Sequence, residues 1–134
     1  MPSMIGQSVR RTEDYRLLTG SGCFADDVSV PGQAYAVMVR SPHAHARIRS
    51  IDIGPAVAVT GVHAVLTSAD VPGSPTYGLE HADQPVLASD VVRYEGEPVA
   101  IVAADHPDAV RLALDAIVVD YEVTTPLVDP GVAE

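Results

Sequence analysis

The pattern of apolar and polar positions is most regular in the last third of the chain. Residues 98–103 (PVAIVA) are continuously apolar, which is typical of a strand covered on both faces. In residues 104–116, Pro107 stands at a first helical position and Asp108 in the first turn. Apolar residues follow at helical spacing, namely Val110, Ala113, Leu114 and Ile117. A helix of about three turns is therefore predicted.

Residues 118–123 (VVDYEV) alternate apolar and acidic side chains, as does a strand with one face in water. Together with the two preceding elements they predict a strand, a helix and a second strand joined by short connections. If the two strands are parallel, the connection is a right-handed crossover.

Shorter strands are predicted upstream, over residues 33–41 (QAYAVMVRS) and 62–68 (VHAVLTS). Between them, residues 46–53 (ARIRSIDI) put Ile48 on one parity and Ile51 on the other, which predicts a bulge near Ser50 or an edge strand. Residues 54–61 read as a short helix or turn. Residues 72–85, with three Pro and two Gly, are predicted to be a mobile loop.

Residues 1–33 show no sustained period beyond a single helical turn in EDYRLLTGSG. They are predicted to form an irregular N-terminal arm, and residues 34–134 the folded domain. With 134 residues, 47% of them hydrophobic and only 4% aromatic, the chain can bury a core of small aliphatic side chains. The predicted fold class is α+β with a mixed β-sheet.

The charge of the chain is unevenly distributed. The net charge of −10 excludes an overall electrostatic footprint for nucleic acid. Residues 1–49 hold six arginines and four acids (+2), whereas residues 50–134 hold two arginines and fourteen acids (−12). Either the arginine-bearing half docks on another protein or its arginines are merely solvated, and both readings stay open. No signal-peptide or membrane-span pattern occurs, so a cytoplasmic location is expected.

Two residue types are nearly or wholly missing. The only cysteine is Cys23, which excludes an internal disulfide and a cysteine-ligated iron–sulfur cluster. The sequence contains no lysine, which excludes Schiff-base chemistry, a P-loop lysine and a biotinyl or lipoyl attachment site. A swinging-arm carrier is therefore rejected. No Gly-rich dinucleotide or phosphate motif occurs either.

The stretch RSPHAHARIRSID (residues 40–52) carries two histidines, His43 and His45, separated by one alanine. In an extended chain both imidazoles would lie on the same side, as metal ligands on a strand do. A tetrahedral zinc site needs further donors, and none stands nearby at a recognised spacing. Ser41 lies close in sequence, but it is not part of a GxSxG nucleophile motif. The histidine pair therefore does not by itself define a site.

The segment YEGEP (residues 94–98) places Glu95 and Glu97 on the same parity of an extended chain. Such a pair can perform acid and base catalysis. A solvated turn leading into the apolar strand is the favoured alternative. From the residues alone, the chain is a globular domain without an active site of its own.

Four stretches carry a resemblance to a known family. They are IGQSVRRTEDYRLLTGSGCFADDV, PGQAYAVMVRSPHAHARIRSID, PAVAVTGVHAVLTSADVPG and LASDVVRYEGEPVAIVAADHPDAVRLALDAIVVDYEVTTPLVDP. In this order and spacing they resemble the N-terminal α/β-hammerhead domain of the molybdenum-binding large subunit of molybdenum hydroxylases. This is the xanthine dehydrogenase and aldehyde oxidase family, and the carbon monoxide dehydrogenase branch is the most similar.

The resemblance implies a role inside a larger oxidoreductase. Such enzymes pass electrons from a molybdopterin cofactor to [2Fe-2S] clusters and commonly on to FAD, on other domains or subunits. A complete large subunit would continue well beyond residue 134, and the molybdopterin-binding segments and the catalytic glutamate belong to that continuation. The resemblance therefore implies that this chain holds no catalytic, cofactor-binding or metal-binding residue and is inactive alone.

By the same resemblance, the expected role is to pack against the molybdopterin-binding domains and the iron–sulfur subunit, in an enzyme that also contains a FAD subunit. Arginine forks and histidines suit such contacts, and the residues expected at the interface are Arg40, His43, His45, Arg47 and Arg49. The chain could be a split subunit, an isolated domain or a truncated product. The alternative is an independent binding module that keeps the hammerhead fold without a redox role.

Overall fold

The computed structural model describes residues 4–132, and the chain divides into two compact units, Met1–Gln33 and Ala34–Glu134. The first unit contains the helix α1 (Asp14–Leu18) and the 3-10 turn η1 (Ala25–Asp27). Its ion pairs within residues 4–33 are local: Arg11 to Asp14 at 2.8 Å and Arg16 to Glu13 at 2.7 Å. None of residues 4–33 is buried. The first unit therefore has no hydrophobic core within the described residues.

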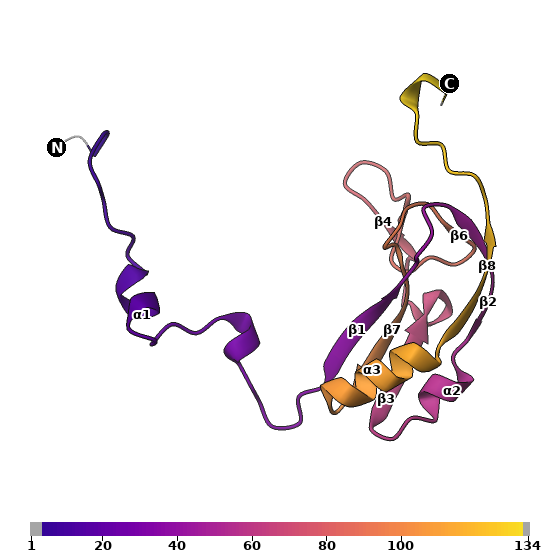
Figure 1. The fold of residues 1–134 in the computed structure, drawn as a ribbon, viewed down its shortest axis with the longest axis horizontal. Coiled ribbons are helices and arrows are strands. Elements are labelled where there is room, and N and C mark those ends of the chain that lie inside the picture. The colour runs from indigo at the N-terminus through magenta and orange to yellow at the C-terminus, as the bar shows by residue number, and fades with distance from the viewer. Residues whose placement is uncertain (1–3, 133–134) are drawn as a thin grey trace. The chain divides into compact units, whose positions relative to one another are not determined.

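Over residues 34–132, the second unit is built from eight strands and two α-helices (Figure 1). The strands are β1 (Tyr35–Arg40), β2 (Ala46–Asp52), β3 (Val62–Thr67), β4 (Thr76–Tyr77), β5 (Gln84–Pro85), β6 (Val91–Val92), β7 (Pro98–Ala104) and β8 (Val118–Val123). The helices are α2 (Gly54–Val57) and α3 (Pro107–Ala116), with 3-10 turns η2 (Ser68–Asp70) and η3 (Pro130–Val132). The first sheet has the order β1-β7-β3 and the second sheet the order β6-β2-β8, while β4 pairs with β5.

The predicted α+β fold class is confirmed. The prediction of a mixed sheet, with both parallel and antiparallel strand pairs, is wrong for the described strands. Every strand pair in residues 4–132 is antiparallel. The strand–helix–strand order is present as β7, α3 and β8, yet β7 lies in the first sheet and β8 in the second. The helix α3 therefore connects two sheets, and no parallel crossover forms between these strands.

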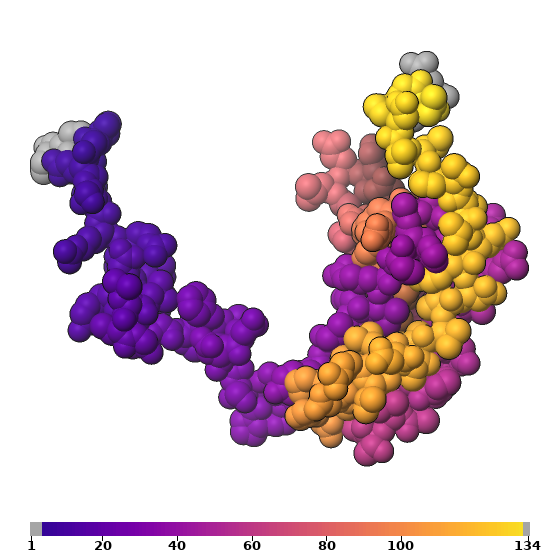
Figure 2. Space-filling model, in the orientation of Figure 1, coloured from indigo at the N-terminus to yellow at the C-terminus, as the bar shows by residue number. Residues whose placement is uncertain are grey.

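The strand β7 is the centre of the first sheet, and its apolar run explains that position. Val102 and Ala104 are buried with Val65 of β3 against Ala109 and Val110 of α3, which forms the first core. The helix begins as predicted at Pro107, and the ring of His106 caps it by accepting a hydrogen bond from the Asp108 amide at 3.1 Å. Figure 2 shows α3 (orange) beside α2 (magenta), whose Ala56 completes this core.

The strand β2 is the centre of the second sheet, and the predicted bulge is present. Its register against β8 shifts between Ile48 and Ser50. The shift brings Ile48 and Ile51, which have opposite parity, onto the same second core, with Val92 and Val99. The bulge thus resolves the conflict in the sequence pattern, and β2 is not an edge strand.

Residues 72–85, predicted as a loop, contain a small antiparallel ladder. Thr76 pairs with Pro85 and Tyr77 with Gln84. The prolines and glycines that suggested an irregular segment lie around this hairpin rather than preventing it. The structure therefore replaces part of the predicted loop with strands β4 and β5, and the mobility of the segment stays a prediction.

Candidate functional site

The histidine-rich stretch forms a bend, residues 41–45, that carries the chain from β1 in the first sheet to β2 in the second sheet. Ser41 is buried at its start. The Ser41 hydroxyl donates to the His43 carbonyl (3.1 Å) and accepts from the His43 amide (3.0 Å). These bonds involve the His43 main chain and not an imidazole. The bend is therefore held by a local serine turn, and the extended geometry that would align both imidazoles is not formed.

The second half of the site is the turn of the YEGEP segment, which faces Ser41. The Ser41 amide donates to the Glu97 carbonyl (3.0 Å), and the Gly96 amide donates to the Ser41 carbonyl (2.8 Å). Gly96 has φ of +90°, which favours glycine at this position. The two segments thus hold each other through main-chain bonds, although they are about fifty residues apart in sequence.

Glu97 is the most buried charged side chain of this region, with 2% of its surface exposed. Its carboxylate accepts a hydrogen bond from the Arg93 amide and lies 3.5 Å from the Arg93 guanidinium. Glu95 is exposed and lies in the turn itself. The two glutamates therefore have different environments. The segment is a turn that leads into β7, as predicted, but the expectation that this turn is solvated is wrong at Glu97, whose side chain is buried.

The two imidazoles of the bend contact different partners on or beside β8. The His43 ring meets the Tyr121 ring edge to face, with 5.0 Å between centroids and an interplanar angle of 76°. The His45 ring is hydrogen-bonded through Nδ1 to the Thr124 hydroxyl, and the Thr124 amide donates to the His45 carbonyl at 3.1 Å. The histidines thus fasten the bend to the end of β8.

Tyr121 is the residue whose titration the site alters. Burial raises the pKa of the phenol above its ordinary value of 10, and the side-chain hydrogen bond with Ser41 offsets part of this rise. Neither Tyr121 nor Thr124 was among the predicted site residues. The alternation of Val119, Tyr121 and Val123 could have placed Tyr121 on the inner face of β8, but nothing in the sequence indicates that β8 lies beside the histidines.

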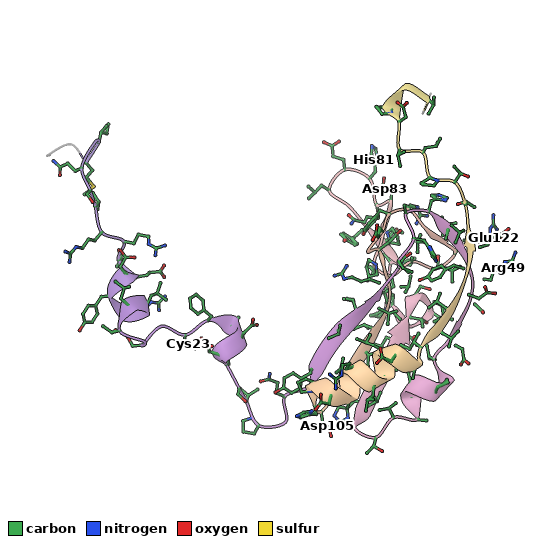
Figure 3. All side chains as sticks on the ribbon, in the orientation of Figure 1. Cys23, Arg49, His81, Asp83, Asp105 and Glu122 are labelled. Atoms are coloured by element: carbon green, nitrogen blue, oxygen red, sulfur yellow. The ribbon has the colours of Figure 1, made fainter. Side chains whose placement is uncertain are left out.

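The three predicted interface arginines also differ in their contacts. The Arg40 guanidinium donates to the Gly96 carbonyl at 2.8 Å, so it supports the same turn. Arg49 lies 3.5 Å from the Glu122 carboxylate, and Figure 3 shows these two side chains next to each other beside β2 and β8. Within residues 4–132, Arg47 is exposed and its guanidinium makes no hydrogen bond or ion pair. Of the five predicted interface residues, Arg47 thus has the side chain least engaged with its own chain.

The donor groups of the described residues do not form a metal-binding cluster. In residues 4–132, no three His, Cys, Asp or Glu side chains gather in a group that could hold a metal ion. Cys23 is a free, exposed thiol, while a [2Fe-2S] cluster needs several ligands of this kind. The described residues do not fit an iron–sulfur cluster, and the absence of cofactors from this chain stays a prediction. No helix in the described chain is long and apolar enough to cross a membrane.

Comparison with known proteins identifies the fold defined by these two sheets and their helices. The family of the aldehyde oxidase and xanthine dehydrogenase α/β-hammerhead domain matches residues 19–125. The chain belongs to this family. The family membership and the hammerhead fold expected from the sequence are therefore confirmed.

Individual relatives place the chain within large subunits of hydroxylases and dehydrogenases. It is 43% identical over 136 residues to the nicotine 6-hydroxylase large subunit of Paenarthrobacter nicotinovorans, covering 96% of this chain and 17% of that one. It is 42% identical over 131 residues to the carbon monoxide dehydrogenase large chain of Afipia carboxidovorans, covering 94% of this chain and 16% of that one. The chain thus spans about a sixth of the length of these relatives.

Solved structures agree with this assignment. The crystal structure of a Cu,Mo-CO dehydrogenase in its carbon monoxide reduced state matches with a TM-score of 0.81 and 42% identity, over 94% of this chain and 16% of that one. Quinoline 2-oxidoreductase from Pseudomonas putida 86 matches with a TM-score of 0.78 and 39% identity, over 93% of this chain and 17% of that one. The chain corresponds to the hammerhead segment of molybdenum hydroxylase large subunits.

Proposed function

We propose that this chain is a non-catalytic structural module of a molybdenum hydroxylase, inactive by itself. The observation that carries the proposal is its correspondence to about a sixth of the large subunits it resembles. The self-contained hydrogen bonding of the bend supports it, because Ser41, His43, His45 and Glu97 are used in holding two sheets together. A chain built in this way is suited to positioning other domains rather than to performing chemistry.

The proposed partners are the molybdopterin-binding part of the large subunit, an iron–sulfur subunit and a FAD subunit, in the cytoplasm. Electron transfer between separate cofactors needs reproducible docking, and a rigid domain can provide it. Among the predicted interface residues, Arg47 is the proposed contact with a partner, because its guanidinium is exposed and no described group of its own chain competes for it. Arg40 and Arg49 would contribute mainly by holding their own chain.

The test is co-expression of this chain with the rest of the large subunit from the same organism. The rest of the large subunit carries an affinity tag. The wild-type chain should co-purify with the tagged protein, and molybdenum should be found with the complex and not with the chain alone. The variant Arg47→Glu should bind about threefold to tenfold more weakly, since a reversed rim charge disturbs electrostatic complementarity. Binding is measured by titration calorimetry on the purified components.

The variant Arg111→Glu is the control, because it reverses the same charge on the exposed side of α3. It loses only a local ion pair with Asp108 and should leave the affinity unchanged. Stoichiometric molybdenum on the chain alone would overturn the proposal. A stable chain that shows no affinity for the rest of the large subunit would instead favour an independent binding module with a hammerhead fold.

A further inference from the structure

One face of the first sheet is covered by α2 and α3, whereas the opposite face keeps large apolar side chains partly exposed. Side chains alternate between the two faces of a strand, so Val102 and Val65 point toward α3 while their neighbours Ile101 and Leu66 point away from it. Met38 pairs with Ile101, and Leu66 pairs with Ile101 from the other side. A row of three large apolar side chains therefore crosses all three strands on the face opposite to α3.

The next row on the same face consists of three alanines. Ala36 pairs with Ala103, and Ala64 pairs with Ala103 from the other side. Small side chains there let another backbone approach the sheet closely, beside the larger row. On this face, a row of small alanine side chains thus lies next to a row of large apolar side chains. None of these six residues is charged.

A groove of about 210 Å³ opens on this face. Its apolar lining comes from Met38, Leu66, Val71, Val86, Leu87 and Ile101. Asp70 also borders it, and its carboxylate accepts hydrogen bonds from the Thr67 amide (2.8 Å) and hydroxyl (3.1 Å). The groove therefore offers an apolar surface without a charge that requires a counter-ion.

The pattern of β7 indicates that this face is meant to be covered. A continuously apolar strand is typical of burial on both faces. On the helix side Val102 and Ala104 are fully buried, whereas Ile101 and Ala103 on the groove side are only half-buried. Leu66 keeps 42% of its surface exposed beside them. Within the described chain, Val71, Val86 and Leu87 border this face but leave the covering layer that the strand pattern implies incomplete.

We propose that the groove face of the first sheet is the docking surface for an apolar face of the rest of the large subunit. This inference rests on the proposed function and names the surface that would perform it. The matched relatives carry more than four-fifths of their length outside the segment covered here, so they have ample chain to supply such a layer. The chemistry of the groove selects aliphatic or aromatic side chains rather than charged ones.

The test compares two exchanges of leucine for aspartate in the co-purification experiment. Leu66→Asp places a carboxylate in the groove and should weaken binding to the rest of the large subunit at least tenfold, because the charge loses its water on docking. Leu112→Asp is the matched control: Leu112 is 57% exposed on α3 and should tolerate the exchange. Equal affinities of the two variants would overturn the proposal.

Folding and self-association are checked in parallel. The milder Leu66→Thr introduces an uncharged, β-branched residue that suits a strand, and it should weaken binding by a smaller factor while the chain still unfolds cooperatively. Sedimentation equilibrium of the wild-type chain should show a monomer; a dimer that Leu66→Asp dissociates would assign the groove to a second copy and overturn the proposal.

Failure of the two proposals is distinguishable. If wild-type chain does not bind the rest of the large subunit, the proposed function fails. If both wild-type and Leu66→Asp chains bind it equally well, only the groove assignment fails.

Discussion

Tyr121 connects the chemistry of the bend to the stability of the fold. Its phenol is partly buried and in edge contact with the His43 ring. Burial raises its pKa, so the folded chain holds the phenol proton more tightly than the unfolded chain does. The corresponding stability is complete below the ordinary tyrosine pKa of about 10 and is lost as the pH rises through the higher pKa of the folded state.

Tyr121→Phe should therefore flatten the decline of the free energy of unfolding between about pH 8 and 11, measured by urea denaturation. At the lower pH the variant should lose no more than about 1 kcal/mol, because only the phenol hydroxyl and its interaction with Ser41 are removed. Tyr94→Phe serves as the control, since Tyr94 is exposed and should leave the alkaline decline as steep as in the wild type. An unchanged alkaline slope in Tyr121→Phe contradicts the assignment.

The strand β7 is the element on which the folded unit most depends, because it pairs with both β1 and β3 and packs against α3. Val102, at its centre, is 0% exposed. Val102→Ala should lower the free energy of unfolding by about 2 kcal/mol through lost burial and a residual cavity, measured by urea denaturation. The exchange Val57→Ala on α2, at a side chain that is 55% exposed, should cost less than about 0.5 kcal/mol. Similar losses in both variants would contradict a central role for β7.

How far the sequence predicts these elements depends on how local their causes are. The apolar run of β7 and the Pro107 start of α3 are set by neighbouring residues, so both were predictable. The bulge in β2 was also predictable, because the isoleucine parity conflict is written in the segment itself. The pairing of the strands was not predictable. A period of two along a strand shows which side chains share a face, but it does not show which strand is the neighbour. The sequence therefore did not reveal that β8 pairs with β2 in the second sheet while β7 lies in the first sheet.

The same distinction applies to the candidate site. The histidines and arginines of residues 40–49 were visible as an unusual cluster, but their partners were not. Thr124 meets His45 across 79 positions, and Gly96 meets Arg40 across 56. Such contacts follow from the packing of two sheets, which no spacing along the chain encodes. The structure therefore shows that four of the five residues also have partners within their own chain, and their role at an interface stays a prediction.

The two units of the molecule differ in how they are stabilised. Both hydrophobic cores of the second unit consist of residues from 39 to 121. The first unit contributes no buried residue between positions 4 and 33, and its large apolar side chains are exposed, including Ile5, Tyr15, Leu18 and Phe24. Burial of apolar surface is the main source of folding stability. The second unit should therefore not need the first in order to fold.

Deletion of residues 1–33 tests this independence. The shortened chain should unfold cooperatively, with a midpoint within a few degrees of the full chain, since a change of about 1 kcal/mol already shifts the midpoint of a domain of this size by roughly 4–8 °C. Thermal unfolding followed by circular dichroism measures both midpoints, and Val102→Ala in the shortened chain should lower its midpoint as much as in the full chain. A shortened chain that is unfolded at room temperature, or one in which Val102→Ala has no effect, would show that the first unit helps to build the core. Neither core of the second unit includes a residue from 4–33. If the midpoint is retained, the next role to test for the exposed apolar residues of this N-terminal arm is contact with another protein.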